Sequence, residues 1–152
     1  GREFRLTVEI TERLLFDDPA EAHKALNDLA ASGIGISIDD FGTGNASLIH
    51  LTRFPVGIIK IDRSFTRAIG RGRVEEALIE TILVMAKRLD LRVVAEGVET
   101  REQYEYLRER NCDFVQGYFL GRPVSAVEFL EMARETGTPR ADGRSMRGGA
   151  AP

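Results

Sequence analysis

The sequence predicts an α/β fold that forms part of a (β/α)8 TIM-type barrel, with about five βα units. Strand-like and helix-like segments alternate five times along the chain, which is typical of a parallel sheet covered by helices. Each predicted strand has one apolar face and places a polar side chain on the other face, at or near its C-terminal end. Barrel enzymes carry their chemistry at that end of the strands, which favours a barrel over a doubly wound open sheet.

The first unit shows how the segments are assigned. Residues 5–10 are β-branched and alternate in polarity, so they predict a strand. Pro19 suits the first position of a helix, with Asp17 or Asp18 as its N-cap, and Gly33 suits its end.

The later elements follow from the same rules. Strands are predicted at short runs rich in Ile and Val, and helices where apolar residues recur at helical spacing. Thr100 and Gln103 form a capping-box pattern at one helix start. In order, we expect a strand at 34–39, a short helix at 47–53, a strand at 56–62, a helical turn at 64–69, a helix at 74–89, a strand at 91–96, a helix from 101, a strand at 113–118 and a helix from about 125 to Glu135.

Composition limits the class of protein. Residues 1–136 form one predicted unit with a net charge of −5, and residues 137–152 a disordered tail with a net charge of +2. The acidic balance argues against DNA, RNA or a membrane surface as the partner. The single Cys112 cannot form an internal disulfide, and no apolar run approaches the roughly 20 residues of a membrane span. We therefore expect a protein of a reducing, cytoplasmic compartment.

Acidic side chains gather at the predicted polar rim. Glu9, Asp39, Asp40 and Glu96 all end predicted strands, and Lys60 is the cation expected among them. Four neighbouring carboxylates need more positive charge than one lysine supplies. Two hard divalent ions bound through oxygen would supply it and would suit in-line displacement at phosphorus. The alternative is a set of salt bridges around Lys60 that only stabilises the barrel interior.

The motifs around these residues resemble those of EAL domains, which are bacterial phosphodiesterases of cyclic di-GMP. The likeness extends from about Phe4 to Glu135 and keeps the family's motif order. It lies in Glu9-Ile10-Thr11-Glu12, Asp39-Asp40-Phe41-Gly42-Thr43-Gly44, Lys60-Ile61-Asp62-Arg63-Ser64-Phe65, Glu96-Gly97-Val98-Glu99-Thr100 and Gln116-Gly117-Tyr118.

The resemblance implies a modified (β/α)8 barrel that hydrolyses cyclic di-GMP to linear pGpG with two Mg²⁺ or Mn²⁺ ions. Glu9 and Asp39 would be metal ligands, and Asp40 a ligand mainly of the second ion. Lys60 would contact the phosphate or the attacking water. Glu96 would position or deprotonate that water.

The resemblance assigns further residues to the substrate and to coupling. Gln116 would support the catalytic site, and Glu99 and Tyr118 would help to bind the guanine and backbone of the dinucleotide. Glu12 would hold the loop that couples substrate, metal and a homodimer partner. That loop consists of Phe41, Gly42, Thr43 and Gly44.

The sequence departs from the family pattern in two places. Asn45-Ala46 replaces a common Tyr-Ser after the loop. The Glu-Ala-Leu motif and an Asn ligand are expected upstream of Gly1, together with a possible GGDEF or sensor domain, so we expect residues 1–152 alone to lack activity. A degenerate receptor of cyclic di-GMP, or a regulatory or dimerising half-domain, is the competing interpretation.

Overall fold

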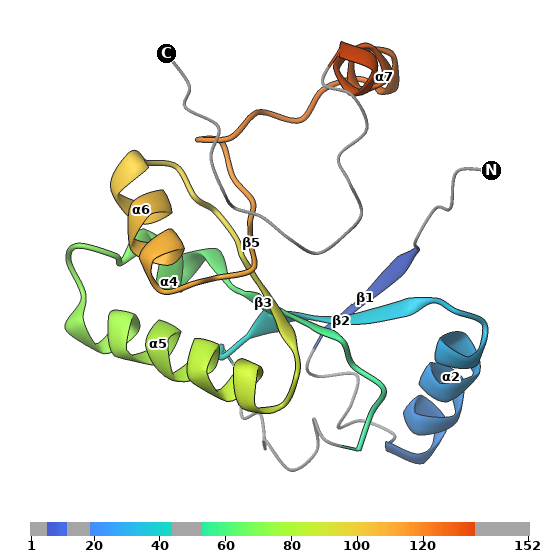
Figure 1. Ribbon diagram of the computed structural model, residues 1–152. Coiled ribbons are helices and arrows are strands. Elements are labelled where there is room, and N and C mark those ends of the chain that lie inside the picture. The colour runs from blue at the N-terminus through green and yellow to red at the C-terminus, as the bar shows by residue number, and fades with distance from the viewer. Residues whose placement is uncertain (1–5, 12–18, 44–52, 136–152) are drawn as a thin grey trace.

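The computed structural model describes residues 6–11, 19–43 and 53–135. Within these ranges, five parallel strands form one sheet in the order of the sequence. The parallel α/β fold predicted from the alternating pattern is therefore confirmed. The strands are β1 (Thr7–Thr11), β2 (Gly35–Phe41), β3 (Ile58–Ile61), β4 (Arg92–Ala95) and β5 (Phe114–Val115) (Figure 1).

Five helices accompany the sheet in the described part of the chain. Where the sequence predicted the first or last residue of a helix and the structure describes that residue, the two agree to within two residues. The caps expected at Asp17 or Asp18, the helix at 47–53 and the tail at 137–152 lie wholly or largely outside the described residues. The helices are α2 (Pro19–Ala31), α4 (Arg63–Arg67), α5 (Arg73–Arg88), α6 (Arg101–Glu109) and α7 (Ala126–Glu135).

Local hydrogen bonds explain where two of these helices begin. Asp62 caps α4, because its Oδ1 accepts a hydrogen bond of 2.9 Å from the Ser64 amide. The predicted capping box at α6 is present: Thr100 accepts from the Gln103 amide, and the Gln103 side chain accepts from the Thr100 amide. Both caps satisfy amides that have no partner inside the helix, and that of α4 directly follows β3.

The hydrophobic core lies on one face of the sheet, against α2 and α5. Ile38, Ile59 and Ala95 from three adjacent strands have no exposed surface, and Ile79 of α5 is equally buried. The opposite face is more open, since Phe114 there remains 40% exposed. The sheet is thus closed on its helix side only, within the residues that the structure describes.

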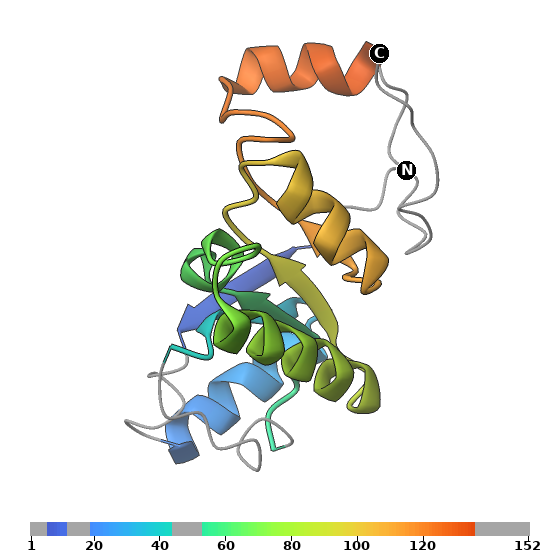
Figure 2. The same ribbon diagram turned by 90° about the vertical axis from the view of Figure 1, so that its left-hand side faces the viewer.

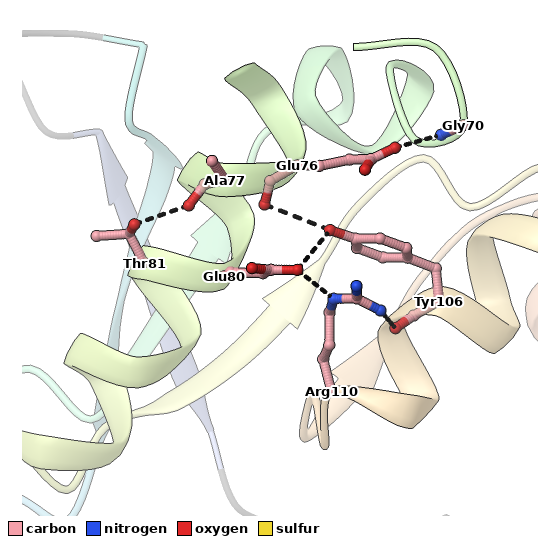
Figure 3. Close-up of polar contacts among 7 residues, drawn as sticks. All are labelled: Gly70, Glu76, Ala77, Glu80, Thr81, Tyr106 and Arg110. Atoms are coloured by element: carbon pink, nitrogen blue, oxygen red, sulfur yellow. Dashed lines mark hydrogen bonds and ion pairs between the residues drawn. The ribbon is translucent and has the colours of Figure 1, made fainter. Parts of the chain in front are cut away.

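Helices α5 and α6 are joined by a polar cluster, which we call the helix cluster and define as Glu80, Tyr106 and Arg110 (Figure 3). Arg110 Nε donates a 2.8 Å hydrogen bond to Glu80 Oε1, and its guanidinium lies 3.5 Å from the centre of the Tyr106 ring. The Tyr106 hydroxyl reaches the Glu76 carbonyl at 3.3 Å and Glu80 Oε1 at 3.4 Å. These contacts hold α6, and hence the segment before it, against α5.

Helix α7 stands apart from the sheet in both ribbon views (Figures 1 and 2). Its Val127, Phe129 and Leu130 are all more than half exposed. None of the described helices is both long enough and apolar enough to cross a bilayer.

Candidate functional site

The carboxyl ends of the strands bring four of the predicted residues together. The Lys60 ammonium lies 2.8 Å from Glu9 Oε2, 3.1 Å from Asp39 Oδ1 and 2.6 Å from Glu96 Oε1. Glu9 comes from β1, Asp39 from β2, Lys60 from β3, and Glu96 directly follows β4. We call these four residues the rim cluster.

Strand register accounts for this convergence. Thr11 pairs with Asp39, and Lys60 pairs with Val94, so neighbouring strands end at similar heights. Side chains alternate along each strand, and Ile38, Ile59 and Val93 point toward the helices. The polar residues of opposite parity are thereby directed to the other face, at the same edge.

A β-bulge lies at the centre of the site. The pairing of β2 with β3 shifts between Ile38 and Phe41, so that Asp39 and Asp40 together oppose Lys60. Asp40 adopts φ 53°, a left-handed conformation that is uncommon outside glycine. The extra residue returns Phe41 to the core, where it is 4% exposed. The bulge thus places two adjacent carboxylates at the rim without exposing the aromatic ring.

The loop after the bulge turns back on itself. Thr43 donates to the Asp40 carbonyl from its amide at 3.3 Å and from its Oγ1 at 2.8 Å. Gly42 adopts φ 93°, and a Cβ built there would lie 3.3 Å from the Phe65 ring of α4. Phe41, Gly42 and Thr43 therefore form a packed turn. Glu12 and Gly44, which were predicted to act with them, lie outside the described residues.

The rim cluster holds one cation against three acidic side chains. Burial alone would lower the pKa of the Lys60 ammonium, but its close contacts with the carboxylates of Glu9, Glu96 and Asp39 outweigh that effect, and the pKa lies above its ordinary range. Lys60 is therefore charged at neutral pH. Acidic side chains thus outnumber basic ones by three to one in the cluster.

The oxygen atoms of the rim cluster are chemically suited to a hard divalent ion. All three acids offer carboxylate oxygens, the ligands that Mg²⁺ and Mn²⁺ prefer. Asp39 Oδ1 is buried and lies within ion-pair distance of Lys60, yet it accepts no well-formed hydrogen bond. In the described residues, however, no three ligating side chains are arranged around one metal position. The Lys60 ammonium lies among these three carboxylates.

Asp40 stands next to Asp39 but outside the rim cluster, and its predicted role as a metal ligand stays a prediction. It belongs to the same bulge, but its side chain is exposed, and the ion pairs of Lys60 involve the other three acids. Phe41 gives the only sequence signal of the bulge, since an aromatic residue stands where strict alternation would require a rim residue.

Gln116 is held at the rim by its main chain. The predicted strand at 113–118 is too long, because β5 ends at Val115. The Gln116 amide nevertheless donates to the Ala95 carbonyl at 2.9 Å, and its carbonyl accepts from the Val98 amide at 3.0 Å. Gln116 is thus fixed beside the segment that carries Glu96.

Glu99 and Tyr118 lie outside the rim cluster. Glu99 Oε1 forms a 3.1 Å ion pair with Arg67. Glu99, Arg71 and Glu102 also line a pocket of about 270 Å³. Tyr118 is 57% exposed, and the Arg122 guanidinium lies 4.7 Å from its ring centre. Their predicted contacts with a dinucleotide remain predictions.

Comparison with known proteins gives consistent matches. The profile of the EAL domain matches residues 1–123. The probable cyclic di-GMP phosphodiesterase PdeN of Escherichia coli is 42% identical over 140 residues, which are 92% of this chain and 27% of PdeN. The chain thus spans about a quarter of that relative.

Two solved structures resemble the fold at similar identity. The PaMucR phosphodiesterase in complex with cyclic di-GMP is 41% identical, with a TM-score of 0.78 over 82% of this chain and 50% of that one. Klebsiella pneumoniae BlrP1, solved with manganese and cyclic di-GMP, is 33% identical, with a TM-score of 0.72 over 77% of this chain and 30% of that one.

Proposed function

Because the chain belongs to the EAL domain family, we propose that it forms the C-terminal part of a domain that hydrolyses cyclic di-GMP to linear pGpG. The single observation that carries the proposal is the rim cluster, in which Glu9, Asp39 and Glu96 meet Lys60. Structural salt bridges have no need of three acids for one base, whereas a site for cations and a phosphodiester does. The domain in this proposal covers residues 1–136.

Two Mg²⁺ or Mn²⁺ ions would be held by Glu9, Asp39 and Asp40, together with ligands from outside this chain. When bound, such ions polarise the phosphodiester and favour ionisation of the attacking water. The bulge contributes to this role, because it presents Asp39 and Asp40 side by side at the strand end.

Lys60 and Glu96 have complementary roles in the proposed reaction. The Lys60 ammonium stays charged and buried, so it can hold a phosphate oxygen or orient the attacking water. The Glu96 carboxylate lies 2.6 Å from that ammonium and would accept the proton of the water. Gln116 would support this pair from the neighbouring strand. Glu99 and Tyr118 would contact the nucleotide outside the rim cluster.

We further propose that the turn at residues 41–43 couples the site to a second copy of the domain. Its packing against Phe65 links the turn to α4, which directly follows the strand of Lys60. A shift of this turn would therefore reach both Asp40 and Lys60.

A second function is supported by one observation. The Lys60 ammonium already occupies the centre of the three carboxylates in the described residues. A domain that kept this arrangement would bind cyclic di-GMP as a receptor without hydrolysing it. Turnover therefore has to be measured separately from binding.

The test uses the complete EAL domain, with Mn²⁺ present, and follows pGpG by chromatography. Asp39→Asn should abolish pGpG formation and weaken Mn²⁺ binding in calorimetry, because it replaces a carboxylate of the bulge with a neutral amide, a much weaker ligand for a hard cation. Asp28→Asn on α2 makes the same chemical change on an exposed helix surface and should alter neither. Binding of cyclic di-GMP without turnover by the unmodified domain would favour the receptor, and unchanged Mn²⁺ binding by Asp39→Asn would contradict the ligand assignment.

A further inference from the structure

Three segments that follow neighbouring strands pack together behind the rim cluster. They are the start of α4 after β3, residues 96–98 after β4 and residues 116–119 after β5. Gly97 and Gly117 lie at the points of closest approach. Each glycine directly follows a residue of the proposed site, Glu96 or Gln116.

Gly97 satisfies two separate requirements. Its φ of +68° is a conformation that side chains with a Cβ adopt at a cost. A Cβ at this position would also lie 2.5 Å from Arg63 Cβ and 3.3 Å from Arg63 Cα. The backbone after β4 can therefore approach the start of α4 only because residue 97 has no side chain.

Gly117 permits an equally close approach on the other side. A Cβ there would overlap the carbonyl oxygen and the amide nitrogen of Val98. Two backbone hydrogen bonds of 3.0 Å flank this contact, from Val98 to the Gln116 carbonyl and from Phe119 to the Val98 carbonyl. The obstacle is main chain in a bonded segment, so it cannot rotate away as a side chain would.

These contacts fix the direction from which Glu96 reaches Lys60. The Glu96 amide donates to the Ile61 carbonyl at 3.1 Å, and the next residue turns sharply at Gly97. The carboxylate then lies 2.6 Å from the Lys60 ammonium. A small displacement of residue 97 away from Arg63 would move the Glu96 backbone and lengthen that contact.

We propose that Gly97 and Gly117 are positioning residues of the site: they touch no substrate and act by placing Glu96 against Lys60 and Gln116 beside it. This inference rests on the proposed phosphodiester hydrolysis. If the two glycines only stabilised the fold, substitution would lower the melting temperature alone. A positioning role predicts that substitution lowers kcat as well.

The structure offers a matched control in Gly33. This glycine at the end of α2 has a φ of +79°, similar to that of Gly97, but a Cβ there would meet nothing within 4 Å. Gly33→Ala therefore introduces the same type of backbone strain without a steric contact. Gly33 lies before the N-terminal end of β2, whereas the rim is at the C-terminal end of that strand. A loss of kcat in Gly97→Ala beyond that in Gly33→Ala therefore measures the effect of the contact with Arg63.

The experiment compares Gly97→Ala, Gly33→Ala, Arg63→Gly and the double variant Gly97→Ala/Arg63→Gly in the complete domain. We expect Gly97→Ala to lower kcat by roughly 10²-fold with little change in KM, as for a misplacement of about 1 Å. Gly33→Ala should lower the melting temperature and leave kcat unchanged. The double variant should recover most of the kcat, because removing Arg63 Cβ relieves the contact.

A second readout does not depend on turnover. The ¹⁵N resonance of the Lys60 ammonium reports its hydrogen bonds and should shift in Gly97→Ala, return in the double variant and stay in place in Gly33→Ala. If the unmodified domain fails to hydrolyse cyclic di-GMP, the proposed function fails, while this resonance still tests the positioning. A kcat and a Lys60 resonance in Gly97→Ala that both match those of Gly33→Ala would overturn the inference.

Gly117→Ala extends the test to Gln116. We expect a loss of kcat beyond that of Gly33→Ala, since the new Cβ must push the Val98 main chain aside. If this variant fails to fold, the Gly97 series decides the inference alone. A folded Gly117→Ala domain with unchanged kcat would exclude Gly117 from the proposed role.

Discussion

The rim cluster and the helix cluster are both built from charged side chains, but they balance their charges differently. In the rim cluster, three carboxylates surround one ammonium. In the helix cluster, Glu80 is matched by Arg110, and the Tyr106 hydroxyl completes the contacts (Figure 3). The helix cluster is neutral as it stands, whereas the rim cluster needs further positive charge. This difference is the reason for proposing that the helix cluster serves the fold and the rim cluster a ligand.

Solvent exposure sharpens the contrast. The Lys60 side chain is 8% exposed, while Arg110 and Glu80 are 32% and 51% exposed. Exposed ion pairs contribute at most about 1 kcal/mol, since water and salt screen them. Substitutions in the two clusters should therefore separate: those at the rim should change activity and metal response, and those between α5 and α6 should change stability only.

The largest effect is expected at Glu96. Glu96→Gln keeps the size of the side chain but removes the base, so turnover in the complete domain should fall by roughly 10²–10⁴-fold. Binding of cyclic di-GMP, measured by calorimetry, should persist. The matched variant in the helix cluster, Glu80→Gln, should leave turnover unchanged. Near-normal hydrolysis by Glu96→Gln would place the base elsewhere and remove the main distinction between the clusters.

Lys60 tests the charge imbalance directly. In Lys60→Met the three carboxylates lose their cation, and the free energy of unfolding without metal should fall by roughly 1–3 kcal/mol. Mn²⁺ should then raise the melting temperature more than in the unmodified domain, because the ion supplies the missing charge. Lys87→Met on the exposed surface of α5 is the control. A metal-free Lys60→Met domain as stable as the original would contradict the imbalance.

The sequence predicted much of the fold and of the rim cluster for one physical reason: side-chain alternation is uniform in β1, β3 and β4. That rule placed Glu9 and Lys60 on the face where the structure has them. It also placed Asp39 correctly, but it could not describe Asp40 and Phe41, because a bulge breaks the period of two there and its pairing partner is distant in sequence. The residue roles at the site remain predictions.

The length of β5 shows a second limit. Residues 116–118 have strand-like composition, but a tight glycine contact with Val98 ends the regular strand at Val115. The sequence also placed Lys60 among the rim acids. The distances that show its ammonium in contact with three of them at once come from the structure alone.

Substitution of Arg110 tests how much the helix cluster contributes to the free energy of unfolding. Arg110→Met removes the ion pair with Glu80 and the cation above the Tyr106 ring, so the free energy of unfolding should fall by about 1 kcal/mol or less. The kcat for cyclic di-GMP should not change. Arg108→Met breaks a pair with Glu105 inside α6 and should cost less, because that pair joins no second element. A loss of turnover in Arg110→Met would break the proposed separation of the two clusters.

The smallest effect is a pH dependence confined to the helix cluster. Burial raises the pKa of the Tyr106 phenol, and the nearby Glu80 and Glu76 raise it further against the opposing effect of Arg110. Above about pH 10 the unfolded chain loses this proton while the folded chain keeps it, so the contribution of Tyr106 to stability declines as pH rises. Tyr106→Phe removes that decline.

Urea unfolding between about pH 8 and about pH 11 measures this contribution. At the lower pH, Tyr106→Phe should be less stable by a few tenths of a kcal/mol, since two long hydrogen bonds are lost. The gap to the unmodified domain should narrow or reverse at the higher pH. A gap for Tyr106→Phe that stays constant across the range would contradict the prediction, because it would mean that the phenol has the same pKa in the folded and the unfolded chain.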